Sequence, residues 1–179
     1  MHDTPYADLD PDRILDAVES LGLRSDGRVL SLNSYENRVY RIGMEEGPAL
    51  VAKFYRPGRW TDEAIGEEHA FAAELVAADL SVVAPLAYGG RTLHPFEGHR
   101  FTLFPMRGGH APEPGDRETL RHIGRVLGRM HAVGDGARFA HRGVMGIDSH
   151  GIDPVEYLLE NRWLPPDLEP NFETLANSL

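Results

Sequence analysis

Three short segments rich in β-forming residues follow one another between residues 29 and 55, and this pattern restricts the fold most. Residues 29–32 and 49–55 are mostly apolar, and residues 38–42 alternate as a half-buried strand does. Only the polar turns 33–37 and 43–48 separate them. Turns this short connect antiparallel neighbours, so the three segments predict an antiparallel meander.

The flanking segments predict helices and two more strands. Asp10 and Pro11 are a capping residue and a first-turn proline, typical of a helix start, and Thr61 can cap a second helix, over residues 62–78. Trp60 and Ile65 are placed for a hydrophobic staple at that cap. Further strands are expected over residues 82–86 and 101–104, and further helices over residues 119–133, 153–161 and 172–179. The expected fold class is α+β, with a five-stranded antiparallel sheet followed by a helical part.

Composition argues against several classes of function. The 179 residues carry 18 basic and 28 acidic side chains, a net charge of −10, which disfavours binding to nucleic acid. No apolar run approaches the length of about 18 residues that a membrane span needs. The polar N-terminus is unlike a signal peptide, and cysteine is absent, so we expect a cytoplasmic protein. The nine histidines show no metal-binding spacing.

Lys53 is the only lysine beside 17 arginines, and it lies near the end of the third expected strand. Glu68 lies on the apolar stripe of the helix that follows, where an unpaired charge is costly. We therefore expect the two side chains to meet, either as a structural ion pair or as the lysine–glutamate pair that presents an ammonium to phosphate oxygens in protein kinases. Glu67 falls on the other side of the helix, where we expect it to be solvated.

The first turn carries hydrogen-bond donors that would lie over such phosphates, namely Ser34 and Asn37. The turn lacks the Gly-x-Gly-x-x-Gly sequence of typical protein kinases. The plain alternative is that Ser34 is only a turn residue, since serine favours turns.

Several segments together closely resemble the bacterial stress response kinases, a type of Ser/Thr protein kinase in the aminoglycoside/choline-kinase-like phosphotransferase superfamily. The matching segments are residues 32–40 and 51–60, Glu67-Glu68-His69, Ala84-Pro85, Phe104-Pro105, Gly108-Gly109 and residues 124–131. The resemblance runs from about residue 11 to residue 155. It implies a protein-kinase-like fold, the use of ATP and Mg²⁺, and phosphorylation of Ser/Thr on protein substrates.

The resemblance also implies roles for residues and a division into lobes. The cofactor-binding residues are then Ser34, Asn37, Lys53, Glu68, Phe104 and Met106, with Glu67 as the alternative to Glu68. Backbone groups of residues 104–106 would meet the adenine. Residues 1–104 would be the nucleotide-binding lobe, residues 105–110 the hinge, and residues 111–179 the start of an incomplete helical lobe.

The chain departs from this family in one respect. The catalytic loop, roughly His-Gly-Asp-x-His-x-x-Asn, does not occur in the 179 residues. The resemblance places the catalytic aspartate and the Mg²⁺ ligands downstream of Leu179, so we expect no catalytic or metal-binding residue here and no phosphoryl transfer by this chain alone.

Two other functions stay open: a phosphotransferase acting on a sugar, choline or aminoglycoside-like small molecule, and a non-catalytic nucleotide-binding regulatory module. The expected partners are ATP and, in a full-length form, a protein substrate, with neither nucleic acid nor membrane. Self-association is also expected, through the apolar stripe of the helix at residues 119–133, if that stripe is exposed.

Overall fold

The computed structural model describes residues 5–109, 111–113 and 115–178. Residues 1–4 of the expected first lobe, residue 110 of the expected hinge and residues 114 and 179 of the expected helical lobe lie outside the described residues. The described chain forms two compact units that divide between His141 and Arg142. The predicted division into a nucleotide-binding lobe (residues 1–104), a hinge (105–110) and a helical lobe (111–179) stays a prediction.

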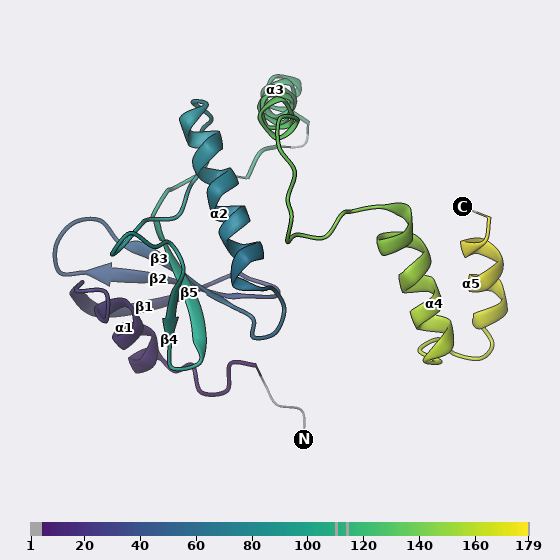
Figure 1. The fold of residues 1–179 in the computed structure, drawn as a ribbon, viewed down its shortest axis with the longest axis horizontal. Helices are drawn as coiled ribbons and strands as arrows, with labels where there is room; N and C mark the ends of the chain where they lie inside the picture. The colour runs from purple at the N-terminus through teal and green to yellow at the C-terminus, as the bar shows by residue number, and fades with distance from the viewer. Residues whose placement is uncertain (1–4, 110, 114, 179) are drawn as a thin grey trace. The chain divides into compact units, whose positions relative to one another are not determined.

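The first unit contains a sheet and three helices (Figure 1). In chain order they are α1 (Pro11–Glu19), β1 (Ser25–Leu32), β2 (Arg38–Met44), β3 (Leu50–Tyr55), α2 (Asp62–Ala77), β4 (His94–Phe96), β5 (His99–Pro105) and α3 (Arg117–Gly134). The five strands are ordered β1-β2-β3-β5-β4, and every neighbouring pair is antiparallel. The α+β class, the five-stranded sheet and the meander of the first three strands are confirmed.

The strand predicted over residues 82–86 was wrong, because these residues form no strand. Pro85 has no N–H to donate, and the Leu86 N–H makes an isolated hydrogen bond of 2.8 Å to the Leu103 carbonyl. The sheet gains β4 instead. Glu97 and Gly98 form the two-residue turn between β4 and β5, and both have positive φ, of 44° and 85°. A hairpin turn of this kind matches the twist of the strands it joins.

The core lies between α1 and one face of the sheet. The Asp10 side chain caps α1 by accepting a 2.9 Å hydrogen bond from the Arg13 N–H. The buried core side chains are Leu9, Ile14, Ala17, Val18, Ile42, Leu50, Ala52, Phe54, Phe101 and Leu103. Burial of each large member contributes roughly 1.5–3 kcal/mol, which fixes the sheet against α1.

The opposite face of the sheet lies under α2. Successive side chains of a strand point to opposite faces, so Lys53 and Tyr55 point away from the core that holds Phe54. Both contact residues of α2, which lies across this face in Figure 1. The predicted cap of α2 is confirmed, because the Thr61 hydroxyl accepts a 3.2 Å hydrogen bond from the Ala64 N–H.

The second unit is helical. It contains one π-helical turn (Asp148–Ile152), α4 (Asp153–Glu160) and α5 (Glu169–Ala176), which packs against α4. The last helix therefore begins three residues earlier than predicted, with Pro170 in its first turn, where a missing N–H costs nothing.

The helix α3, in the first unit, buries none of its described side chains, and Leu120 and Leu127 are 49% and 47% exposed.

No helix within the described ranges has the length and hydropathy of a membrane span.

Candidate nucleotide site

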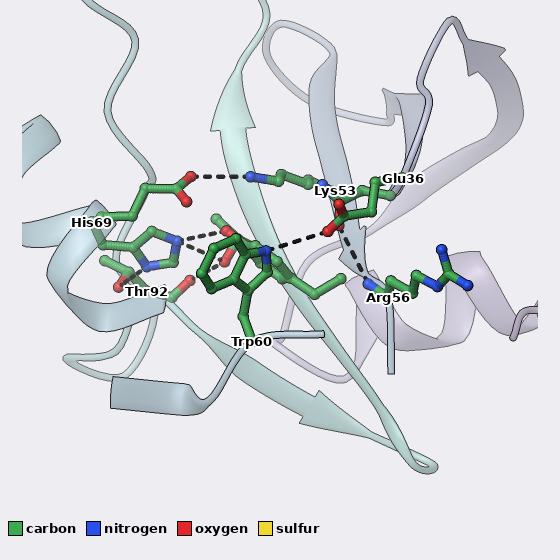
Figure 2. A network of polar contacts seen from close by, with 10 residues as sticks. Glu36, Lys53, Arg56, Trp60, His69 and Thr92 are labelled. Atoms are coloured by element: carbon green, nitrogen blue, oxygen red, sulfur yellow. Dashed lines mark hydrogen bonds and ion pairs between the residues drawn. The ribbon is translucent and has the colours of Figure 1, made fainter. Parts of the chain in front are cut away.

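Lys53 and Glu68 form an ion pair between β3 and α2 (Figure 2). The Lys53 Nζ lies 3.0 Å from the Glu68 Oε1. The side chains are 20% and 38% exposed, so neither partner of the pair is fully buried. The predicted meeting of these two residues is confirmed.

A buried network of polar side chains lies next to the Lys53–Glu68 pair. The Tyr55 hydroxyl lies 2.8 Å from the His69 Nε2, and the His69 Nδ1 lies 2.7 Å from the Thr92 hydroxyl. Tyr55 is 2% exposed and His69 4% exposed. The Lys53 Nζ also lies 4.5 Å from the centroid of the Tyr55 ring, a cation–π contact. The network therefore connects β3, α2 and the segment before β4 around the ammonium.

His69 is neutral in this network. Burial lowers the pKa of His69, although the neighbouring Glu68 carboxylate acts in the opposite direction. A neutral imidazole has one donor and one acceptor nitrogen, which two hydroxyl partners can satisfy. The sequence interpretation missed this network, although a histidine directly after Glu68 and a tyrosine two residues after Lys53 were a readable signal.

The loop between β1 and β2 is held by the segment that precedes α2. The Glu36 carboxylate accepts hydrogen bonds of 3.2 Å from the Trp60 indole N–H and from the Arg59 Nε–H. The Asn37 side-chain oxygen accepts one of 3.3 Å from the Arg56 N–H. Glu36 was not among the predicted site residues, and Trp60, expected only as a staple, is also its hydrogen-bond donor.

Tyr6 holds the same loop from the N-terminal segment. Its hydroxyl donates a 3.0 Å hydrogen bond to the Glu36 carbonyl. Burial raises the pKa of Tyr6 to about 12, so the hydroxyl keeps its proton at neutral pH. The loop is therefore fixed through both the side chain and the main chain of Glu36.

The other predicted site residues lie around this loop and along the same sheet face. Ser34 is exposed in the loop. Phe104 pairs with Val51 on β3, two residues before Lys53, which separates them by roughly 7 Å along the strand. Met106 follows directly after β5 and is half-buried. The β register thus places Lys53 and Phe104 on one face, and the nucleotide roles predicted for all six residues stay predictions.

Glu67 was expected to be solvated, and this holds only in part, because the residue is half-buried and its carboxylate has main-chain partners. Its two carboxylate oxygens accept hydrogen bonds of 2.6 Å from the Ala140 N–H and 2.9 Å from the His141 N–H. The helix period placed Glu67 away from the sheet correctly, but the chain after α3 returns to this side of α2.

The described residues supply no group of three or more histidine, aspartate or glutamate side chains that could hold a metal ion.

Comparison with protein families gives a match over most of the chain. The model of the phosphotransferase enzyme family matches residues 28–179.

Curated proteins with similar sequences are kinases. Stress response kinase A of Shigella flexneri is 41% identical over 174 residues, which are 97% of this chain and 53% of that protein. Its counterpart in Escherichia coli (strain K12) is 40% identical, and the serine/threonine protein kinase RdoA of Salmonella typhimurium is 36% identical, both over the same shares. The chain thus spans about half the length of the curated relatives it matches.

Solved structures share the fold. The amicoumacin kinase hAmiN, solved in complex with AMP-PNP, Ca²⁺ and its ligand, superposes with a TM-score of 0.76 over 99% of this chain and 56% of that chain, at 18% identity. A microcompartment-associated aminopropanol kinase superposes with a TM-score of 0.58 over 83% of this chain and 56% of that chain, at 16% identity. At these identities the likeness concerns the fold, and it confirms the kinase-like architecture.

Proposed function

Since the chain belongs to the phosphotransferase enzyme family, we propose that it binds ATP on the face of the sheet that lies under α2. The ion pair of Lys53 with Glu68, at 3.0 Å, is the observation that carries this proposal. Phosphoryl transfer depends on positioning and on neutralising phosphate charge, so an ammonium held in place and still accessible has a direct use.

Each predicted residue has a part in this proposal. Lys53 binds phosphate oxygens, and Glu68 orients its ammonium. Ser34 and Asn37 offer donors from the loop above the phosphates, and Asn37 also anchors that loop through its side-chain oxygen. Phe104 and the backbone up to Met106 bind the adenine at the end of β5.

We propose that the full-length protein is an ATP-dependent, cytoplasmic Ser/Thr protein kinase. The support is the 36% identity to the serine/threonine protein kinase RdoA, beside 41% identity to a stress response kinase A, each over 97% of this chain. The 179 residues contain no His-Gly-Asp-x-His-x-x-Asn sequence, so this chain alone binds the nucleotide without transferring phosphate. Mg²⁺ would neutralise phosphate charge beside Lys53, and the described residues provide no group of three or more side chains to hold it.

Titration calorimetry with a non-hydrolysable ATP analogue and Mg²⁺ tests the nucleotide site. Lys53→Ala should weaken binding at least about tenfold, because a hydrogen bond to a charged group contributes roughly 1.5–3 kcal/mol. Arg24→Ala is the matched control, since the Arg24 side chain is 81% exposed and lies before β1. Equal affinities of the wild type and Lys53→Ala would contradict the proposed site.

The phosphate acceptor needs a separate assay, made on a full-length protein. Transfer of labelled phosphate to serine or threonine of a protein supports the protein kinase. Transfer only to a sugar, choline or aminoglycoside would replace it with a small-molecule phosphotransferase. If a full-length protein binds nucleotide but transfers no phosphate, the remaining hypothesis is a non-catalytic regulatory module.

A further inference from the structure

Two consecutive glutamates of α2 make contacts in different directions. Glu68 reaches the Lys53 ammonium on the sheet. Glu67 reaches the main-chain N–H groups of Ala140 and His141, beyond the end of α3. Consecutive side chains of a helix are turned by about 100°, so a single turn of α2 contacts both the candidate phosphate-binding lysine and the segment after α3.

Helix α3 and the segment that follows it contact α2 along one stripe of α2. One turn after Glu67, the Phe71 ring meets the Phe139 ring edge-on, with centroids 5.7 Å apart. At the end of the helix, the Arg129 guanidinium donates hydrogen bonds of 2.9 Å and 3.0 Å to the carbonyls of Ala78 and Asp79. Glu67 is therefore one end of a continuous line of contacts.

The Glu67 contact depends on a carboxylate. Both of its oxygens accept from main-chain N–H groups, at 2.6 Å and 2.9 Å, and such charge-assisted bonds are stronger than neutral ones. A glutamine at this position has the same shape but one acceptor, and its NH₂ group would face an N–H donor. The site thus distinguishes a carboxylate from its neutral isostere.

We propose that Glu67 is a positioning residue, which couples residues 137–141 to the Lys53–Glu68 pair and through it to nucleotide affinity. The inference rests on the nucleotide site proposed above. An α-helix moves as a rigid body, and Glu67 is only one residue from Glu68, about 1.5 Å along the axis. A shift of α2 that follows release of residues 140–141 therefore changes the orientation of the Glu68 carboxylate and of the ammonium it holds.

The coupling has to act in both directions, because linkage between two binding events is reciprocal. If the Glu67 contact raises nucleotide affinity, nucleotide binding stabilises the same contact by an equal factor. The amide protons of Ala140 and His141 report on it directly, since they are the donors in these hydrogen bonds.

The experiment compares the wild type with Glu67→Gln, Glu67→Ala and the control Glu74→Gln, all in the 179-residue chain. Glu74 is an exposed carboxylate two turns further along α2. Hydrogen exchange followed by NMR should show faster exchange of one of the two amides in Glu67→Gln and of both in Glu67→Ala. Glu74→Gln should exchange as the wild type does.

The coupling itself is read at the Lys53 Nζ and Glu68 carboxyl resonances and in the affinity for a non-hydrolysable ATP analogue. Both resonances should shift in Glu67→Gln without nucleotide, and the affinity should fall by about fivefold or more, the lower range of allosteric couplings. Adding the analogue to the wild type should slow exchange at Ala140 and His141 by the same factor.

The outcomes separate this inference from the proposed function. Normal nucleotide affinity and unshifted Lys53 and Glu68 resonances in a folded Glu67→Gln would overturn the coupling and leave the nucleotide site standing. A wild type that binds no nucleotide would refute the proposed function, while the resonances of the nucleotide-free protein would still show whether Glu67 positions the Lys53–Glu68 pair.

Discussion

The Trp60 indole N–H donates a 3.2 Å hydrogen bond to the Glu36 carboxylate, and this contact joins the segment before α2 to the loop between β1 and β2. The loop has no Gly-x-Gly-x-x-Gly sequence. Side-chain anchors instead determine its position before a ligand arrives. A loop that is already ordered loses less conformational entropy on binding, which favours affinity.

Replacing Trp60 with phenylalanine removes the indole N–H but keeps an aromatic ring, and it should loosen the loop between β1 and β2. In Trp60→Phe, we expect larger fast-timescale motion of residues 33–37 and a loss of nucleotide affinity of about threefold to tenfold, the equivalent of one hydrogen bond. NMR relaxation and calorimetry measure the two effects. Trp163→Phe is the control, since Trp163 is 66% exposed and lies in the second unit. An unchanged loop in Trp60→Phe would show that the other anchors suffice.

The Glu68 carboxylate should matter more for ligand binding than for stability. A partly exposed ion pair contributes about 1 kcal/mol or less to folding, so Glu68→Gln should lower the melting temperature by only a few degrees. Nucleotide affinity should fall several-fold, because the ammonium loses the group that orients it. A double-mutant cycle with Lys53→Ala measures this. Additive effects of the two substitutions on affinity would contradict the pairing.

Stability should depend on pH through His69. Burial lowers the pKa of His69 in the folded chain below its unfolded value of about 6.5. Between these two values the unfolded chain binds more protons, so the free energy of unfolding falls as the pH decreases from about 6.5 and levels off below the folded pKa. Urea unfolding at a series of pH values between 4 and 8 measures this slope.

The variant His69→Gln should reduce that slope without abolishing it. Burial also lowers the pKa of His94, which therefore contributes a slope of the same sign. Glu68 raises the pKa of His69 and Lys53 lowers it, so Glu68→Gln should steepen the dependence. An identical slope in the wild type and His69→Gln would show that His69 is not the titrating group.

Arg129 should stabilise the end of α2. Its guanidinium donates to two carbonyls at the C-terminus of that helix, where a cation is favourable. We expect Arg129→Met to lower the free energy of unfolding by about 1 kcal/mol, measured by urea denaturation. Arg125→Met, one turn earlier on α3, should have little effect. If both substitutions lowered the free energy of unfolding equally, the loss would come from the positive charge of α3 in general and not from the Arg129 hydrogen bonds.

The exposed stripe of α3 should promote self-association. Leu120 and Leu127 are 49% and 47% exposed on this helix. Light scattering should show oligomers of the wild type at high concentration and fewer of them in the variant Leu120→Gln/Leu127→Gln. A wild type that stays monomeric across the concentration series would refute this prediction.

The parts of the fold that depend on short-range signals could be predicted from the sequence. The caps Asp10 and Thr61 and the first three strands are where the local sequence indicates, except that β1 begins at Ser25, four residues earlier than predicted. The strand over residues 82–86 was wrong because its apolar residues lie in a partly exposed loop, while β4 has only three residues. A period-two pattern needs more residues than β4 offers.

The site residues could be predicted only where a charged side chain lies on the apolar face of a single helix or strand. Glu68 stood out because it interrupts an apolar stripe, and its contact with Lys53 followed. Glu67 and Glu36 looked like ordinary surface carboxylates, because their partners are 73 and 24 residues away in the sequence. Hydrogen bonds between distant segments leave no local pattern, so these anchors became visible only in the folded chain.

The position of Lys53 has a practical consequence for chemical labelling. Its side-chain amine is the only one in the 179 residues, and 20% of the side chain is exposed. An amine-reactive reagent can therefore modify one internal position in addition to the N-terminus, and intact-protein mass spectrometry can count the adducts. The rate of that single modification becomes a footprint of whatever covers the ammonium, measured without any substitution in the chain.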